Sequence, residues 1–416
     1  MDSKALNVGI GFATGRRSFR KVLRTNIFSW RESGLTEEKD VRLNLLVAYD
    51  LEYSNTKPAD YTHINKRLLD LIDDTCFIGK AETKKEINNL ANAGVVSEEE
   101  ARLIFAAGYA GKRNIVLYMA LKRKMDYLIY LDDDEYPMAV TKTRASAVWG
   151  GQNVLTTHLN NIQNADITNG HHCGYISPIP YIEFDQVLSE PIFRSFIEAI
   201  SNDIVNWEAI RKVMANGGVT YADTGILTTD EAFEVIEVNN AKFISGANLC
   251  INLTNPQHVS PFYNPPGARG EDTFLSTCLR ERKVLRVPCY TFHDGFSTYQ
   301  HLLDGVLPTR LKYIRADTDH VRTRFYQACI GWVRYKPLFT YITQPERYEE
   351  VIAFTRSRLD ETLPKICAYF GREDFMNIKK ELDRYHRNVK KHRKQFLDAQ
   401  LIWGKICDYL SEQQQG

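Results

Sequence analysis

The densest group of residues that could do chemistry is the acidic run at 132–135, within the segment YLIYLDDDEYP. Neighbouring carboxylates repel one another, so such a run costs free energy unless a cation, a solvated turn or a raised pKa relieves it. Asp50 and the pair His293-Asp294 follow other apolar runs in the same way. Mg²⁺ and Mn²⁺ take carboxylate oxygens and often an imidazole nitrogen, and they are commonly shared with a substrate diphosphate. The pattern therefore predicts a metal and phosphate site, although each group alone is also typical of a turn, a helix cap or a core histidine.

The elements that must position these groups follow from the hydrophobic periodicity. Strands are expected at 5–13, 41–49, 127–131, 167–179, 242–252 and 284–294, and helices at 18–30, 62–74, 83–94, 97–107, 112–124, 188–217 and 272–281. Strands separated by helices imply a mostly parallel sheet. In such sheets ligands bind beyond the carboxyl ends of the strands, so Asp50, the run at 132–135 and His293 should gather at one edge.

The last quarter of the chain has a different pattern. From about residue 300 nearly every segment has helical periodicity, so we predict an α/β domain at 1–298 and an all-helical module at 299–416. The stretch 378–410 predicts one long amphipathic helix with a basic outer face. Packing or homo-oligomerisation through its apolar side is one interpretation, and contact of its basic side with an anionic membrane surface is the other.

Composition limits the classes of protein to consider. The chain has 416 residues, 44% of them hydrophobic, and a net charge of +1, so it lacks the basic excess of a dedicated nucleic-acid binder, and no nucleic-acid partner is expected. The first residues lack a leader pattern, no run approaches the roughly 20 apolar residues of a membrane span, and the eight cysteines are scattered. We therefore expect a cytoplasmic protein, peripheral at the inner membrane face if the basic helix docks there.

Several motifs occur in the order found in a known family. They are ATGRR after the first strand, Asp50 after the second, Gly111-Lys112-Arg113-Asn114, the Asp132-x-Asp134 turn, Gly246-Ala247-Asn248, Gly270-Glu271-Asp272 at a helix start, and His293. Over roughly residues 5–297 this order resembles the GT-A glycosyltransferases, and especially the family 2 type of nucleotide-diphospho-sugar transferases. The resemblance implies a GT-A, Rossmann-like fold and a Mn²⁺- or Mg²⁺-dependent transfer of a sugar, with inversion, from a UDP- or GDP-sugar to an acceptor hydroxyl. The acceptor would be a glycan, a lipid-linked molecule or a small molecule.

The resemblance also implies roles for individual residues. Asp272 would be the general base, with Glu271 binding or orienting the acceptor. The metal ligands would be Asp132, Asp134 and His293. Donor contacts would come from Thr14, Arg17, Asp50, Lys112, Arg113, Asp132 and Asp133, and the acceptor would lie over Gly246 and Asn248.

Two other interpretations stay open at this point. A sugar-phosphate nucleotidyltransferase would share the sheet and the divalent metal, but GFATGRRSF only loosely resembles the glycine-rich nucleotide loop of those enzymes. A non-catalytic scaffold that binds a nucleotide sugar could dispense with the carboxylates at Asp134 and Asp272, and both are present. Release of a nucleoside diphosphate, rather than pyrophosphate or nothing, distinguishes the first interpretation from these two.

Overall fold

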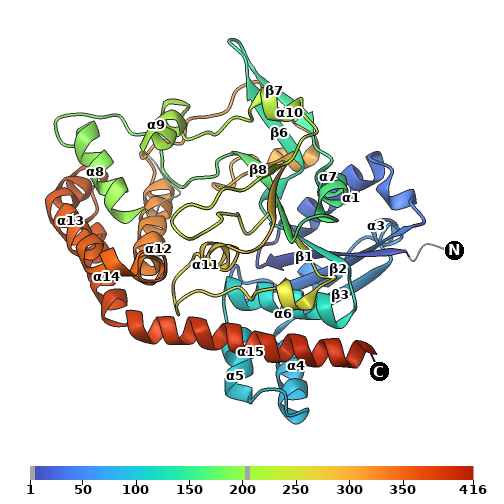
Figure 1. Ribbon diagram of the computed structural model, residues 1–416. Helices are drawn as coiled ribbons and strands as arrows, with labels where there is room; N and C mark the ends of the chain where they lie inside the picture. The colour runs from blue at the N-terminus through green and yellow to red at the C-terminus, as the bar shows by residue number, and fades with distance from the viewer. Residues whose placement is uncertain (1–4, 202–206, 416) are drawn as a thin grey trace.

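The computed structural model describes residues 5–201 and 207–415, and its centre is a nine-stranded mixed sheet (Figure 1). The strand order is β3-β2-β1-β4-β10-β8-β11-β5, and β9 pairs with β11 beside this path. β1 to β4 run parallel, as do β8 and β11, whereas β10 is antiparallel to both of its neighbours. The predicted mostly parallel α/β sheet is therefore confirmed. Its strands are β1 (Leu6–Thr14), β2 (Val41–Tyr49), β3 (Asp74–Ile78), β4 (Tyr127–Leu131), β5 (Glu135–Tyr136), β8 (Ile167–Gly174), β9 (Phe233–Glu234), β10 (Leu249–Asn252) and β11 (Val284–His293).

Helices cover both faces of this sheet. The apolar sides of α1 (Phe19–Glu32) and α7 (Val154–Ile162) form a core with one face, and α6 (Tyr109–Lys122) packs on the other. Gly11 in β1 lets α6 approach closely, because a Cβ there would lie 2.7 Å from Val116 Cγ1. The other helices before residue 300 are α2 (Ala59–Thr62), α3 (Lys66–Leu69), α4 (Lys80–Asn92), α5 (Glu98–Ile104), α8 (Glu190–Ile200), α9 (Trp207–Ala215), α10 (Thr224–Leu227) and α11 (Glu271–Thr277).

The C-terminal region is helical from α12 onward, as predicted. Its helices are α12 (Asp319–Thr343), α13 (Tyr348–Phe370), α14 (Asn377–Arg387) and α15 (Val389–Gln415). α12 and α13 pack with α8, and α15 runs back beside α5 (Figure 1). One hydrophobic core continues from α6 into these helices, and the division at residue 298 stays a prediction. None of the helices in the described ranges is long and apolar enough to cross a bilayer.

Three local features differ from the expectations. The region 62–74 forms only short turns of helix before β3, and the hairpin of β6 (Met138–Lys142) and β7 (Ala147–Gly151) is not predicted. The single helix expected at 378–410 is divided at Asn388, between α14 and α15. Its apolar positions are nevertheless buried on both sides of the break, so the predicted packing face is confirmed.

Candidate active site

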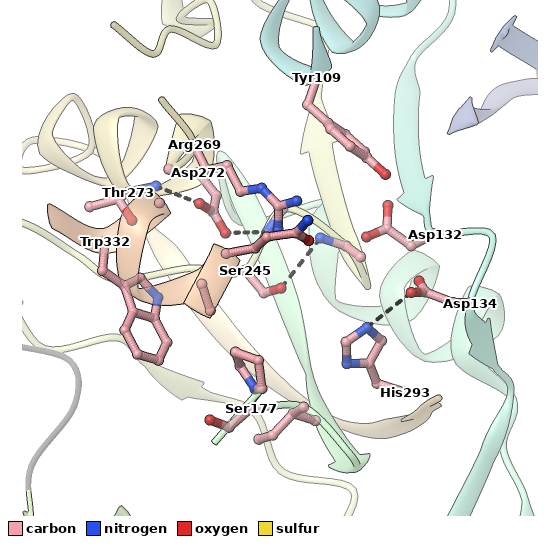
Figure 2. Close-up of a pocket in the computed structure, with 18 of the residues that line it drawn as sticks. Tyr109, Asp132, Asp134, Ser177, Ser245, Arg269, Asp272, Thr273, His293 and Trp332 are labelled. Carbon is pink, nitrogen blue, oxygen red and sulfur yellow. Dashed lines mark hydrogen bonds and ion pairs between the residues drawn. The ribbon is translucent and has the colours of Figure 1, made fainter. Parts of the chain in front are cut away.

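A cavity of about 590 Å³ opens at the carboxyl edge of the sheet (Figure 2). Its walls come from the loop after β1, the bend after β4, the end of β11, the start of α11 and one side of α12. Segments far apart in the sequence therefore meet here, as the strand-end argument predicts. The predicted site residues that line the cavity are Arg113, Asp132, Asp134, Gly246, Glu271, Asp272 and His293.

The acidic bend follows β4 directly, and its side chains point in different directions. Asp132 and Asp134 line the cavity. Asp133 is 2% exposed and accepts hydrogen bonds from Thr14 Oγ1 at 2.6 Å and Arg16 Nη1 at 2.7 Å. Thr14 is buried as well. Thr14 and Asp133, both predicted to contact the donor, therefore fix the bend against β1 from below the cavity surface.

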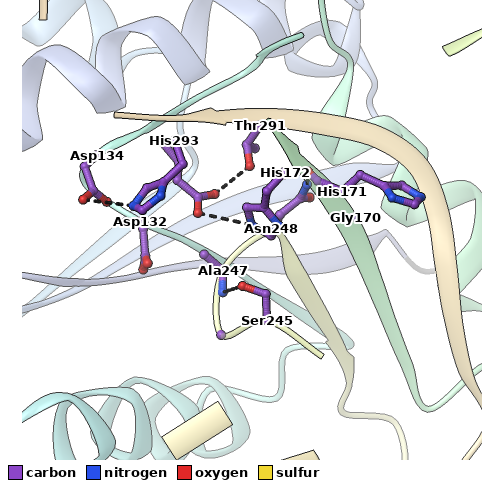
Figure 3. A network of polar contacts seen from close by, with 12 residues as sticks. Asp132, Asp134, Gly170, His171, His172, Ser245, Ala247, Asn248, Thr291 and His293 are labelled. Atoms are coloured by element: carbon purple, nitrogen blue, oxygen red, sulfur yellow. Dashed lines mark hydrogen bonds and ion pairs between the residues drawn. The ribbon is translucent and has the colours of Figure 1, made fainter. Parts of the chain in front are cut away.

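Strand pairing brings His293 to the same bend. β5 pairs antiparallel with the end of β11, so that His293 lies opposite Glu135. His293 Nε2 consequently lies 3.3 Å from Asp134 Oδ2, and Thr291 Oγ1 donates to Glu135 Oε2 at 2.7 Å (Figure 3). Burial alone would lower the pKa of His293, but the Asp134 carboxylate, assisted by Glu135, raises it to about 9. The imidazole therefore carries a proton at neutral pH and forms an ion pair with Asp134.

Cations and a raised pKa together relieve the repulsion within the bend. Arg16 Nη1 lies 2.6 Å from Asp134 Oδ2. Burial raises the pKa of Asp134, but His293 and Arg16 outweigh it and hold that pKa well below its ordinary value. Burial and the neighbouring carboxylates raise the pKa of Asp132 to about 7, against the opposing effect of Arg113. Asp134 is therefore the firmly ionised carboxylate of the cavity, and Asp132 titrates near neutral pH.

Arg113 of α6 connects the two acidic groups of the site. Its Nη2 lies 3.0 Å from Asp132 Oδ1, its Nε lies 3.4 Å from Glu271 Oε1, and its Nη1 donates to the Gly246 carbonyl oxygen. The side chain is 3% exposed, and its guanidinium carbon lies 5.2 Å from the centre of the Tyr130 ring. A guanidinium held by this many partners acts mainly as a rigid spacer between the bend and α11.

Glu271 and Asp272 begin α11, as predicted. Asp272 Oδ1 accepts a hydrogen bond from Thr273 N at 2.9 Å, and Asp272 Oδ2 accepts one from Gly246 N at 3.1 Å. Since a carboxylate has about four acceptor positions, Asp272 keeps capacity for a substrate hydroxyl. Burial raises the pKa of Glu271, as does the charge of Asp272, with Arg113 opposing both. Of the two carboxylates, Asp272 is oriented as an acceptor and Glu271 is paired.

Asp50 and Lys112 lie outside the cavity lining, where they form an ion pair of 2.8 Å. Burial raises the pKa of Asp50, whereas Lys112 and backbone N–H groups lower it by a larger amount. The net shift of this pKa is therefore downward. The cavity wall nearest to them in sequence consists of Tyr53 and Tyr109. The two aromatic rings, rather than the ion pair, present surface to a ligand in the cavity.

Arg17 and Asn248 are two further predicted site residues that do not line the cavity. Arg17 is exposed and donates to the Asn55 carbonyl oxygen at 3.0 Å, whereas its neighbour Arg16 faces the bend. Asn248 is fully buried, and its side-chain oxygen lies 2.8 Å from His158 Nε2. The structure therefore does not bring Arg17 or Asn248 to the cavity.

Several cavity residues escape prediction from the sequence. Arg269 and Arg324 both line the cavity, and Arg324 Nε is buried with no hydrogen-bond partner in the described part of the chain. The Arg324 guanidinium lies 5.5 Å from the centre of the Phe296 ring. Trp332 forms part of the opposite wall (Figure 2). ATGRR could have indicated that one of its two arginines faces the bend, but nothing in the pattern of α12 distinguishes Arg324 from its other arginines.

Asp134 and His293 would supply only two of the ligands of a divalent cation, and Arg16 would have to release Asp134 Oδ2 for the cation to bind there. Within residues 5–201 and 207–415, no three His, Cys, Asp or Glu side chains converge as a complete ligand set. Asp134 Oδ2 and His293 Nε2 are 3.3 Å apart, and neighbouring ligands on an octahedral cation with bonds of about 2.1 Å are about 3 Å apart. Mg²⁺ sites commonly use one or two carboxylates and complete the shell with water and substrate phosphates. Asp132, the third predicted ligand, faces Arg113 instead.

Comparisons with known proteins add little to this geometry. No protein-family model and no curated protein matches the chain. Seventeen chains of solved structures match. One is the apo form of mouse xyloside xylosyltransferase 1, with 12% sequence identity and a TM-score of 0.20, over 46% of this chain and 58% of that chain.

Proposed function

We propose that this protein is a glycosyltransferase that moves a sugar, with inversion, from a UDP- or GDP-sugar to an acceptor hydroxyl with the help of Mn²⁺ or Mg²⁺. The observation that carries the proposal is the meeting of Asp134, His293 and Asp272 in one cavity, from three separate elements of the chain. The order of motifs that resembles the GT-A enzymes predicts the same three groups. The mixed, mostly parallel sheet is consistent with that fold.

The donor phosphates would bind at the end of the cavity that carries the charges. Asp134 and His293 would hold the cation, with the imidazole giving up its proton as the cation binds, and the bound cation would withdraw charge from the departing diphosphate. The guanidinium groups of Arg324 and Arg269 line the same cavity, and the buried Arg324 Nε has no partner among the described residues. Arginine is suited to binding phosphate through two parallel hydrogen bonds. These two arginines would therefore stabilise the leaving diphosphate, and Tyr53 or Tyr109 would stack on the nucleobase.

The acceptor would bind at the other end of the cavity. Figure 2 shows Asp132, Asp134 and His293 on one side, and Trp332 with Asp272 on the other. A sugar hydroxyl is a poor nucleophile, and a carboxylate within hydrogen-bond reach can take its proton as the new bond forms. Asp272 would accept that proton, because Thr273 N and Gly246 N orient its carboxylate without occupying all of its acceptor positions.

A rigid polar connection would keep the two ends of the site in register. Arg113 bonds to Asp132 and to the Gly246 carbonyl oxygen, and the amide of Gly246 bonds to Asp272. The base and the acidic bend therefore cannot move independently over a large range. Transfer requires the acceptor oxygen and the anomeric carbon to lie within about 3–3.5 Å, and a fixed spacing between base and phosphate site serves this requirement.

Incubation with Mn²⁺ and a panel of nucleotide sugars tests the proposal. We expect slow hydrolysis of one UDP- or GDP-sugar, with release of the nucleoside diphosphate, and at least a hundredfold slower release by Asp134→Asn. Asp360→Asn on α13 is the matched control, because it removes an exposed carboxylate charge and should leave the rate unchanged. Failure of every UDP- and GDP-sugar to react, or equal rates in the Asp134→Asn variant, would contradict the proposal. Formation of pyrophosphate from a nucleoside triphosphate and a sugar phosphate would favour a nucleotidyltransferase instead.

A further inference from the structure

A second and larger concavity lies beside the candidate active site. It has a volume of about 1190 Å³ and is walled by α1, by Ser54 and the segment 63–71 around α3, and by Ser297 and Gln300. Arg16 lines both this concavity and the active-site cavity. We call it the α1–α3 groove. Its cationic lining residues are Arg16, Arg17, Arg20, Lys21, Arg24, Arg31 and Arg67.

The periodicity of α1 explains how these cations share one side. Arg20, Arg24 and Arg31 are separated by four and seven residues, so they recur on the same face of the helix. At 1.5 Å per residue, this stripe is about 16 Å long. Arg67 of α3 contributes positive charge to the same groove. A single phosphate would cover only a fraction of this length, whereas an extended chain with several negative groups could follow it.

Three of the seven cations, Arg17, Arg20 and Arg67, have no carboxylate partner among the described residues. The other four do, since Arg16 pairs with Asp133 and Asp134, and Arg31 pairs with Glu32 at 3.3 Å. Among the described residues that line the groove, none is acidic. Asp304 pairs with Lys21 at 3.1 Å and with Arg24 at 3.5 Å. Arg17 and Arg20 instead donate to backbone carbonyl oxygens, at 3.0 and 3.1 Å, which orients their guanidinium groups without cancelling the charge. In a chain with a net charge of only +1, this is a strong local concentration of positive charge.

We propose that the α1–α3 groove binds a stretch of an anionic glycan, and that this glycan is the acceptor polymer on which the enzyme acts. This inference rests on the proposed transferase function. The groove adjoins the cavity at Arg16, on the side of Asp134, so a polymer held in the groove by one stretch would extend across the cavity toward Asp272. Binding in the groove raises the effective concentration of that second stretch in the cavity. The concave shape favours a chain over a flat bilayer surface, which touches only the rim of a groove.

Fluorescence anisotropy with a labelled, sulfated ten-sugar glycan tests the groove directly. The test variant is Arg20→Gln/Arg31→Gln/Arg67→Gln, which removes three exposed cations and leaves Asp304 with both of its partners. The matched control is Lys390→Gln/Lys391→Gln/Lys394→Gln on α15, with the same change in net charge. We expect the wild-type protein to bind the glycan with an affinity that falls as salt rises, and the groove variant to bind at least tenfold more weakly. The control variant should bind as the wild type does.

Further measurements distinguish a glycan ligand from a membrane or nucleic-acid ligand, and test the groove separately from the proposed transferase function. Equal binding by the groove variant and the wild type would overturn it. So would groove-dependent binding to phosphatidylcholine vesicles with 20% phosphatidylserine, or to a twenty-nucleotide single strand, that is tighter than binding to the glycan. Nucleotide-sugar hydrolysis is measured on the same proteins and should be equal in the groove variant and the wild type. If hydrolysis is found without groove-dependent glycan binding, only this inference fails. If the binding is found without hydrolysis, the transferase function fails together with the role of the glycan as acceptor, and the groove stands only as a glycan-binding site.

Discussion

Replacement of Arg113 by methionine tests the idea that this arginine holds the two acidic groups of the site together. The side chain is 3% exposed and carries two ion pairs, to Asp132 and Glu271, together with the hydrogen bond to the Gly246 carbonyl oxygen. Removing one partner of a buried ion pair typically costs about 3–5 kcal/mol, because a buried charge is left without compensation. We therefore expect Arg113→Met to lower the free energy of unfolding by about 4 kcal/mol, measured by urea denaturation at pH 8.

The pH dependence of this loss follows from the carboxyl group that is left behind. The pKa of Asp132 is already raised to about 7, and loss of the guanidinium raises it further. A carboxyl group with a raised folded-state pKa stabilises the fold below its unfolded-state pKa, and this contribution is lost as pH rises through the folded-state pKa. The variant should therefore be closer to the wild type at pH 6 than at pH 8. The added change Asp132→Asn should restore part of the stability at pH 8.

The matched control for Arg113→Met is Arg102→Met. Arg102 is 65% exposed and pairs with Glu98 on the surface of α5, so its loss should cost no more than about 0.5 kcal/mol. A loss below about 1 kcal/mol for Arg113→Met at pH 8, or one that does not change with pH, would refute the account of Arg113 as the buried connection between the bend and α11.

The remaining predictions concern the base, a buried histidine and a tightly packed glycine. Asp272→Asn should lower the transfer rate by about 10²–10⁴-fold with an unchanged donor Kd; a near wild-type rate would show that the base is misassigned. Burial lowers the pKa of His158 to about 4, so the stabilisation from its neutral form is complete above pH 6.5. The free energy of unfolding should therefore fall by about 3 kcal/mol as the pH drops to 4. Urea denaturation at a series of pH values should show a smaller fall in His158→Gln. Gly111→Ala places a Cβ 1.7 Å from the Ala106 carbonyl oxygen and should lower the free energy of unfolding by about 1–3 kcal/mol. Gly404→Ala in α15, where the added Cβ meets open space, should raise it slightly. Equal effects of the two substitutions would contradict the close packing at Gly111.

Strands composed mainly of apolar residues are predicted well from the sequence. The expected strands at 41–49 and 127–131 coincide with β2 and β4, because buried parallel strands need apolar residues on both faces. The segment 242–252 is the instructive exception. Only Leu249–Asn252 forms a strand, because the preceding loop turns toward Arg113 and Asp272 to make hydrogen bonds through Gly246. Local strand propensity is overridden there by contacts with residues more than twenty positions away.

In the candidate site too, some residues are predicted from local sequence motifs, whereas others are placed only by packing between distant segments. Motif order predicts Asp134, His293 and Asp272, because each follows a strand or begins a helix at the edge where such ends gather. Sequence alone does not indicate which arginine of the pair at 16–17 faces the bend, since that depends on the turn that ends β1. Nor does it indicate Arg324, which lines the cavity because α12 packs against α11, the helix that begins with Glu271 and Asp272.

Calorimetric titration of UDP and GDP, with and without Mn²⁺, tests the central claim most directly. That claim is that Asp134 and His293 hold a cation against a bound diphosphate. We expect one nucleotide to bind at least about tenfold more tightly with Mn²⁺, and this gain to be lost in His293→Gln but kept in His258→Gln, a half-exposed histidine paired with Asp166. Binding that is the same with and without Mn²⁺, or a Mn²⁺ effect that survives in His293→Gln, would contradict the account.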